Sequence, residues 1–224
     1  MRNLYFIVEG ETEEEFIKRL LIPYLYGQGL IGHMQPIMVH MSGGGHGHSN
    51  VKHFLNTIEP VLYYAGEPVI TSLLDYFRFP RQQPAFAACG VQPTAAAQAQ
   101  CLQRALFDAV QRIRLYPRFL PYVQLHEFEA LLFADVAGHE LQPAGIQMEV
   151  AAVINDYPSP ETINSRPEFA PSKRLAAIYQ QHGQRYRKAA DAVDIAELIG
   201  MERLLERCPL FSQWVRALLT AVRQ

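Results

Sequence analysis

Short apolar runs rich in β-branched and aromatic residues alternate with segments of helical periodicity in the first part of this chain. Strands separated by helices favour a parallel sheet with helices on its faces. The order strand-helix-strand-helix-strand-helix-strand therefore predicts an α/β fold. The expected strands are residues 3–8, 35–41, 69–74 and 122–125, and the expected helices between them are residues 12–26, 51–64 and 95–115.

The chain changes character after Asp135, where proline-rich loops and further helical patterns replace the strands. A length of 224 residues suits one domain, with an appended helical part. We therefore expect an α/β core over residues 1–136 and a loop and helical extension over residues 137–224, packed on the same core. The helices expected in this extension are residues 172–182, 191–199, 201–207 and 210–222.

The composition limits the classes of protein that the chain can represent. Apolar residues make up 49% and charged residues 19%, which argues against disorder. The formal net charge of -2 does not predict a broad basic surface for nucleic acid, although a local basic groove remains compatible with it. No run approaches the roughly 20 apolar residues that a membrane span needs, so we expect no membrane association.

The three cysteines, Cys89, Cys101 and Cys208, are too widely spaced for a zinc ribbon. Their odd number does not suggest a disulfide framework, and they fit a reducing cytosol. Because the N-terminus also has no apolar signal segment, we expect a cytoplasmic protein.

The first expected strand runs directly into a group of carboxylates. Thr12 and Glu15 fit a capping box at the start of the following helix, and acidic residues in a first helical turn complement the helix dipole. This local explanation does not cover Glu9, which stands at the end of the strand and before the turn residue Gly10.

Other acidic residues also follow expected strands. Asp75 ends the third strand, and His126 and Glu127 follow the fourth. Because the active crevice of an open parallel sheet lies at the carboxyl ends of its strands, we expect Glu9 and Asp75 to face one crevice, with His126 or Glu127 beside them. Clustered carboxylates repel one another, and a hard divalent cation such as Mg²⁺ resolves that conflict. Alternatively, Asp75 and Glu127 cap helices or pair with arginines.

The stretch "HEFEALLF" predicts a helix that starts directly after the fourth strand. Phe128, Leu131 and Leu132 have the spacing of one buried helical face. On this pattern Glu129 turns away from that face.

The block "APSKRL" adds Ser172, Lys173 and Arg174. We expect Lys173 to approach the acidic crevice, where an ammonium group would hold a phosphate or stabilise developing charge. The alternative is that Ser172 only caps a helix and that both basic side chains are solvated.

His46, His48 and His53 lie in or beside the glycine-rich stretch "SGGGHGHSN". Three histidines at this spacing would suit a transition metal, but a flexible setting favours a mobile loop near the crevice. The glycines could instead bring backbone N–H groups close to a phosphate.

Five segments together resemble the bacterial family called domain of unknown function 4276, and the strand ends resemble the Toprim fold of primases, topoisomerases and overcoming-lysogenization-defect nucleases. The segments are "VEGETEEEF", "LLDYFRFP", "PYVQLHEFEALLFAD", "PETINSRPEFAPSKRL" and "AELIGMERLLERCPLFSQW". The resemblance implies a Toprim-like, Rossmann-like parallel sheet flanked by helices. It places Glu9 at the Toprim glutamate, which is a metal ligand or general acid/base, Glu13 at a further acidic position and Asp75 at the first aspartate of an Asp-x-Asp pair. Phe77 stands where the second aspartate is expected, and Glu127 or Glu129 would replace it.

These observations lead to a metal-dependent phosphodiester hydrolase of nuclease type as the first hypothesis, with Mg²⁺ or Mn²⁺ as cofactor and nucleic acid as substrate. The resemblance also implies an ATPase partner of the SMC or AAA type and a role in defence or DNA processing. A catalytically silent module that binds such an ATPase, and a phosphate- or nucleotide-binding protein, are the alternatives. The expected catalytic residues are Glu9, Asp75, Glu127 and Lys173, the metal ligands are Glu9, Glu13, Asp75 and Glu127, and the substrate-binding residues are Ser172, Arg174 and His126.

Overall fold

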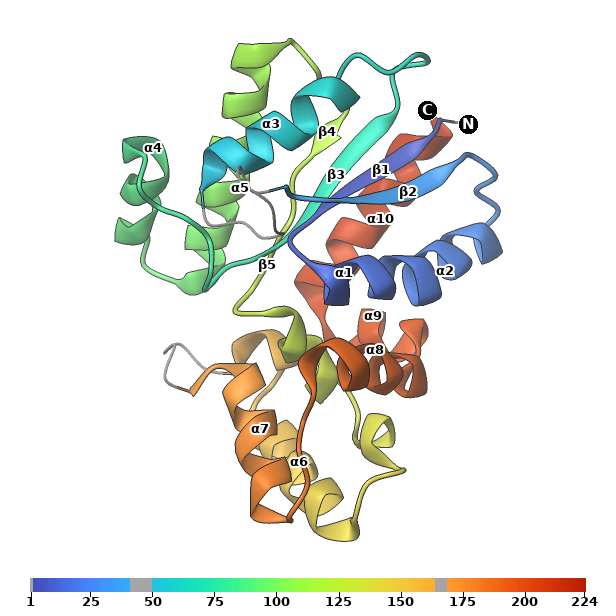
Figure 1. Ribbon diagram of the computed structural model, residues 1–224, viewed down its shortest axis with the longest axis vertical. Coiled ribbons are helices and arrows are strands. Elements are labelled where there is room, and N and C mark those ends of the chain that lie inside the picture. The colour runs from blue at the N-terminus through green and yellow to red at the C-terminus, as the bar shows by residue number, and fades with distance from the viewer. Residues whose placement is uncertain (1, 41–49, 164–168) are drawn as a thin grey trace.

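The computed structural model describes residues 2–40, 50–163 and 169–224, and its centre is a five-stranded sheet in which every pairing is parallel (Figure 1). The order is β2-β1-β3-β4, and β5 also pairs with β3. The predicted α/β fold with a parallel sheet is confirmed. The strands are β1 (Leu4–Val8), β2 (Met34–Met38), β3 (Val69–Asp75), β4 (Phe119–Leu120) and β5 (Val123–Gln124).

The fourth expected strand is split into two short pieces, β4 and β5. Pro121 lies between them and has no N–H group to donate. The hydroxyl of Ser72 on β3 bridges the break, because it accepts from Tyr122 N and donates to Tyr122 O, both at 2.9 Å. The chain thus stays attached to β3 as far as the carboxyl end of the sheet.

Helices cover both faces of the sheet, as the alternation of side chains along β1 requires. Phe6 and Val8 belong to a core shared with the N-terminal helices and α10, whereas Ile7 packs in a second core with α3 and α5 (Figure 1). The first face carries α1 (Glu11–Phe16), the π-helical turn η1 (Ile17–Leu21), α2 (Ile22–Gly27) and α10 (Pro209–Arg223), and the second carries α3 (Val51–Val61) and α5 (Ala95–Ile113).

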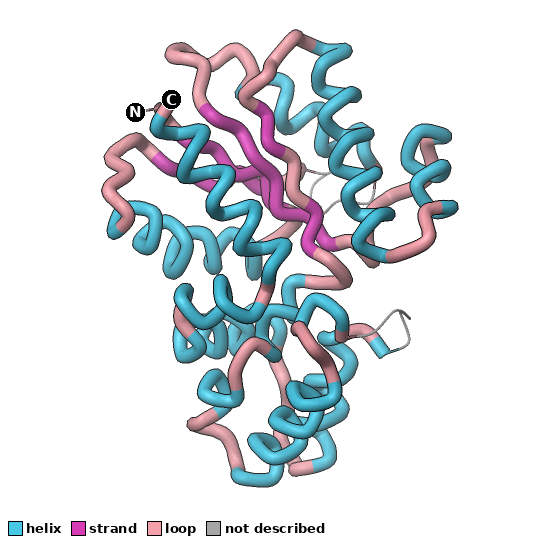
Figure 2. The backbone as a smooth tube through the Cα atoms, turned by 180° about the vertical axis from the view of Figure 1, so that it is seen from behind, coloured by secondary structure: helices cyan, strands magenta, loops and turns pink. Residues whose placement is uncertain are grey.

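The C-terminal part forms a helical half beyond the carboxyl ends of the strands, and α10 returns from it to the sheet (Figures 1 and 2). The indole of Trp214 on α10 stacks on Tyr122 and donates to the hydroxyl of Thr71 at 2.8 Å. One hydrophobic core therefore runs from the sheet into the helical half. The helices of this half are η3 (Phe128–Phe133), η4 (Val136–His139), α6 (Ala144–Asp156), η5 (Pro160–Thr162), α7 (Pro171–Gln181), α8 (Lys188–Ile199) and α9 (Met201–Arg207).

The ends of the helices test the predicted caps. The capping box of Thr12 and Glu15 is wrong, because α1 already begins at Glu11 and its N-cap, Gly10, makes no side-chain cap. At the start of α3 the N-cap is Asn50, whose side chain accepts from Lys52 N at 2.9 Å.

The segment after β5 also differs from its prediction. Phe128–Phe133 is a 3₁₀ helix in which all six residues are buried, so the expected outward turn of Glu129 is wrong. Six residues with three per turn present side chains on every side, and the surrounding helices cover them all. A buried carboxylate needs a partner there, and α8 provides one, as described below.

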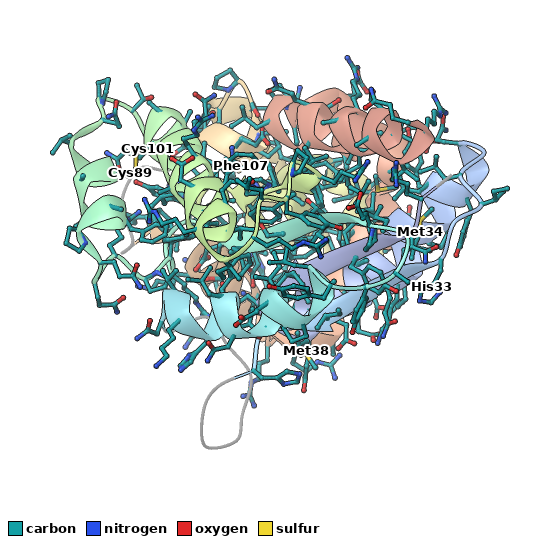
Figure 3. All side chains as sticks on the ribbon, turned by 90° about the horizontal axis from the view of Figure 1, so that it is seen from above. His33, Met34, Met38, Cys89, Cys101 and Phe107 are labelled. Carbon is teal, nitrogen blue, oxygen red and sulfur yellow. A yellow bond between two sulfur atoms is a disulfide. The ribbon has the colours of Figure 1, made fainter. Side chains whose placement is uncertain are left out.

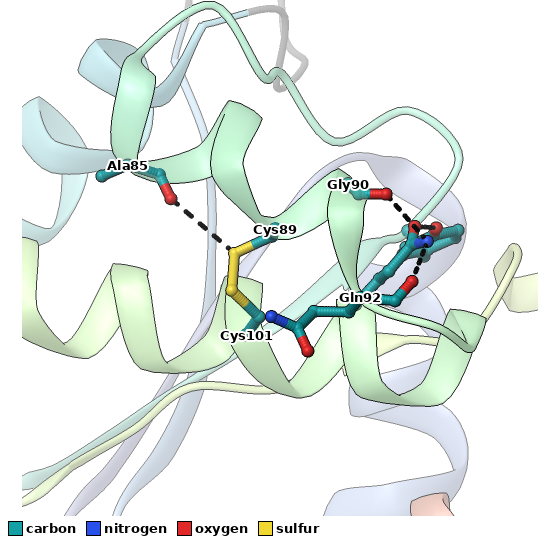
Figure 4. Close-up of a disulfide and its surroundings, with 7 residues drawn as sticks. Ala85, Cys89, Gly90, Gln92 and Cys101 are labelled. Carbon is teal, nitrogen blue, oxygen red and sulfur yellow. Dashed lines mark hydrogen bonds between the residues drawn. A yellow bond between two sulfur atoms is a disulfide. The ribbon is translucent and has the colours of Figure 1, made fainter.

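The odd number of cysteines did not suggest a disulfide framework, but two of the three are joined by a disulfide, which does not fit the reducing cytosol that was expected. Cys89, on η2 (Ala88–Val91) after the short helix α4 (Pro84–Ala87), forms a disulfide with Cys101 on α5 (Figures 3 and 4). The bond closes a loop with a sequence separation of 12 residues, and Cys208 is free and buried. In the part of the chain that the structure describes, no helix has the length and apolar character of a membrane span.

Candidate functional site

A cavity of about 490 Å³ opens at the carboxyl ends of β1 and β3. Its walls come from three places that are far apart in the sequence: the first turn of α1, the end of β3 and the start of α8. The lining residues are Glu9, Gly10, Glu11, Thr12, Glu13, Asp75, Arg78, Lys188 and Ala189.

Glu9 and Asp75 converge on this cavity because β1 and β3 are neighbouring parallel strands, with Val8 opposite Leu73. The backbone N–H of Asp75 donates to Glu9 Oε2 at 3.3 Å. The predicted placement of these two acids in one crevice is confirmed. Glu13 enters the same cavity from α1 and is only 4% exposed.

A lysine from the helical half balances these acids. Lys188, the first residue of α8, places its Nζ 3.0 Å from a carboxylate oxygen of Glu129 and 3.8 Å from Asp75 Oδ2. Glu129 is fully buried on η3. An acid and a lysine that lie 59 residues apart thus form an ion pair beside the cavity.

The burial of the acids changes their protonation. Burial, with a smaller contribution from the charge of Asp75, raises the pKa of Glu9 to about 7. Burial likewise raises the pKa of Glu13 to about 7 and that of Asp75 well above its ordinary value. Burial alone would lower the pKa of Lys188, but the charges of Asp75, Glu129 and Glu13 outweigh it, so this pKa is raised. The site therefore holds protons that solvent-exposed carboxylates would lose.

Two acids, Asp75 and Glu127, also accept hydrogen bonds from backbone N–H groups at the starts of helices, in line with the alternative interpretation that they cap helices. Asp75 Oδ1 accepts from Phe128 N at 2.8 Å at the beginning of η3, and Glu127 Oε2 accepts from Ser172 N at 3.1 Å in the first turn of α7. Asp75 thus has both roles, since it caps η3 and lines the cavity. Glu127 is buried and does not line the cavity.

The structure places the basic residues of "APSKRL" away from the cavity. Lys173 is exposed and is not among its lining residues, so the expected approach to Glu9 and Asp75 is not seen. Arg174 donates to the hydroxyl of Tyr157 at 3.1 Å. Ser172 donates its backbone N–H to Glu127 Oε2. Lys188 occupies the place that was expected for Lys173.

His126 lies next to the site but outside the cavity. It is 3% exposed, has a φ of 67°, and its ring centroid is 5.0 Å from that of Phe77. Burial lowers its pKa to about 4, so the imidazole is neutral at pH 7. Phe77, at the position of the missing aspartate, donates its backbone N–H to His126 O at 2.9 Å and adds no carboxylate.

The sequence pattern did not reveal Lys188 or the inward direction of Glu129. Arg187 and Lys188 precede an apolar helix and look like a solvated basic cluster, and Arg187 indeed pairs with Asp191 at the surface. The local sequence offered no signal for either feature, because both depend on the packing of α8 against η3.

The donor set of the cavity suits a hard cation. All the acidic side chains that line it offer carboxylate oxygens, which Mg²⁺ and Mn²⁺ prefer, while both carboxylate oxygens of buried Glu129 lie 3.0 Å from Lys188 Nζ. Among residues 2–40, 50–163 and 169–224, however, no three His, Cys, Asp or Glu side chains already have metal-binding geometry. Lys188 provides the positive charge in this arrangement, so a metal would have to draw the carboxylates together. His46 and His48 lie outside the described residues, and His53 lies within α3.

Comparison with known proteins gives one positive result. Neither the curated proteins nor the solved structures contain a match to this chain. Residues 8–219, which carry the sheet from the last residue of β1 onward, the cavity and the helical half, match the family described as "Domain of unknown function (DUF4276)". The chain belongs to that family.

Proposed function

We propose that the protein is a metal-dependent phosphodiester hydrolase of nuclease type. The observation that carries this proposal is a group of carboxylates, half-buried Glu9 with buried Glu13, Asp75 and Glu129, gathered with Lys188 at the carboxyl ends of two adjacent parallel strands. Such an arrangement is costly for folding, because like charges are buried together. A site with that cost and an adjoining cavity is a candidate for catalysis.

We further propose that the fold is Toprim-like and that the family is bacterial. The parallel sheet supports this reading, as do Glu9 after β1 and Asp75 at the end of β3. Phe77 departs from the Asp-x-Asp pattern. Glu129 on η3 supplies an additional acid, which pairs with the cavity residue Lys188.

In this proposal Glu9, Glu13 and Asp75 hold Mg²⁺ or Mn²⁺, and Glu127 fixes α7 beside them. The bound metal would polarise the phosphate and lower the pKa of a water molecule. Because Glu9 has a pKa of about 7 before a metal binds, binding of the cation would release a proton from its carboxylate near neutral pH. The ammonium of Lys188 stabilises negative charge that develops on phosphate oxygens.

The proposed setting is the cytoplasm, with an ATPase of the SMC or AAA type as partner in defence or DNA processing. A second candidate is a catalytically silent module that binds the same kind of ATPase. Two observations favour it: Phe77 removes one expected ligand, and Lys188 already pairs with Glu129 and lies near Asp75.

Cleavage assays separate the two candidates. Purified protein is incubated with plasmid DNA and with labelled single-stranded DNA or RNA, with Mn²⁺, Mg²⁺ or EDTA. We expect metal-dependent cleavage that Glu9→Gln and Asp75→Asn each reduce at least a hundredfold, whereas Lys173→Ala, on the exposed surface, cleaves like the wild type. Absence of cleavage with either metal, with and without the ATPase, would favour the silent module.

A further inference from the structure

Arg78 is a cation at the site whose side chain has no hydrogen-bonded or ion-paired partner among residues 2–40, 50–163 and 169–224. It lies three residues beyond Asp75, lines the cavity and is exposed to solvent. Within the described residues its guanidinium makes no hydrogen bond or ion pair, and it stacks on no aromatic ring. The charges of Asp75 and Glu9 nevertheless raise its pKa, against the lowering effect of burial, so it lies within the field of the acids.

Arg81, in the same segment, differs from Arg78 because its side chain packs against the protein. Its guanidinium lies 4.7 Å from the ring centre of Tyr76 and donates to Tyr76 O. Arg78 has no comparable role in packing. Its five donors are free to bind a planar or tetrahedral anion that enters the cavity.

The backbone that carries Arg78 is firmly held. Tyr76 N donates to Gln124 O at 3.0 Å, Phe77 N donates to His126 O at 2.9 Å, and Phe79 is 4% exposed. The residues on both sides of Arg78 are therefore held in place, although the Arg78 side chain itself makes no contact of this kind. A fixed backbone limits the positions that the guanidinium can reach and keeps it at the cavity.

We propose that Arg78 binds a backbone phosphate of a nucleic acid and so positions the strand across the acidic cavity. This inference rests on the proposed function and deepens it by assigning a substrate-binding residue. A guanidinium binds phosphate through two parallel hydrogen bonds, which fix orientation as well as distance. Because the surrounding carboxylates repel anions, binding through Arg78 requires that a divalent cation first neutralises them.

The test measures the binding of a fluorescent 12-nucleotide single-stranded DNA by fluorescence anisotropy. The buffer contains Ca²⁺, which we use as the divalent cation so that binding is measured without turnover. Arg78→Ala should weaken binding about tenfold or more, as expected for a charged hydrogen-bonded contact, and Arg78→Lys should restore part of it. The slope of log affinity against log salt should fall by about 0.7 for the lost phosphate contact. Without Ca²⁺ the wild type and Arg78→Ala should both bind poorly.

Arg104→Ala is the matched control, because Arg104 is an exposed arginine on α5 whose contacts, an ion pair with Asp108 and a guanidinium 5.7 Å from the ring centre of Phe107, lie within its own helix. In cleavage assays Arg78→Ala should raise KM and leave kcat within a fewfold. If Arg78→Ala binds and cleaves as Arg104→Ala does, the inference fails while the proposed function stands. If the wild type neither binds nor cleaves the strand, the inference about Arg78 and the proposed function both fail.

Discussion

Lys188 is the residue on which the acidic site depends. Its Nζ lies within ion-pair distance of Glu129 and Asp75, which are 0% and 2% exposed. Removing one partner of such a group leaves a buried charge without compensation, which is far more costly than losing a surface ion pair.

Lys188→Met should therefore destabilise the protein by about 3 kcal/mol at pH 7.5, measured by urea unfolding. The loss should shrink at pH 5, where the acids with raised pKa values take up protons. Lys173→Met, at an exposed position, is the control and should change stability by less than about 0.5 kcal/mol. An equal loss at both pH values would show that Lys188 acts through packing and not through charge.

Glu9 makes stability depend on pH in a direction that can be worked out. Its pKa is about 7 in the folded protein against 4.5 for the unperturbed group, so the folded state binds more protons between these values. Stability should then fall as pH rises from about 4.5 through 7, by roughly 2–3 kcal/mol from this residue.

Glu9→Gln keeps the acceptor for Asp75 N and removes the titration. The variant should gain stability over the wild type at pH 8 and show little difference at pH 4.5. Thermal or urea unfolding across this range checks the prediction, and a wild-type profile with the same slope as that of Glu9→Gln would contradict it.

The disulfide is the main covalent constraint at the scale of elements. It fastens η2, and with it the segment that follows β3, to the middle of α5. Cross-linking a loop of this length stabilises a fold by about 3 kcal/mol, chiefly through the unfolded chain.

Cys101→Ser should lose about this amount relative to the oxidised wild type in urea unfolding. A reducing agent should lower the stability of the wild type to the level of the variant and leave the variant unchanged. Mass spectrometry after thiol alkylation counts the free cysteines, and three free thiols in the native, non-reduced protein would contradict the disulfide.

Helix α10 begins on a buried carboxylate. Glu161, 2% exposed on η5, accepts from Leu210 N at 2.9 Å and Phe211 N at 2.8 Å, two of the N–H groups that the helix itself cannot satisfy. Glu161→Ala should cost about 2–3 kcal/mol, because these donors stay buried without partners. Glu202→Ala, exposed in the first turn of α9, is the control for removal of a glutamate and should be nearly neutral. Equal effects of the two substitutions would refute the capping role.

At the scale of the whole molecule, the sequence was sufficient for features that follow from local pattern. The strands β1 to β3, the helices α3 and α5, and the shared crevice of Glu9 and Asp75 were all predicted, because apolar periodicity and the geometry of parallel sheets determine them. The split of the fourth strand was missed, although Pro121 marks it.

The missed features depend on packing between distant segments. Lys188 reaches the site because α8 packs against η3 and α1, and there it pairs with the buried carboxylate of Glu129. The pairing of Cys89 with Cys101 likewise depends on how η2 folds back on α5. Nothing in the local pattern of these residues distinguishes them from surface charges or free thiols.

The acids at the ends of β1 and β3 are proposed to form a metal centre, and Mn²⁺ binding measured by calorimetry tests this proposal most directly. The wild type should bind Mn²⁺, Asp75→Asn and Glu9→Gln should each weaken that binding at least tenfold, and Lys173→Ala should bind as the wild type does. No binding of Mn²⁺ by the wild type, or equal binding by Asp75→Asn, would contradict the claim.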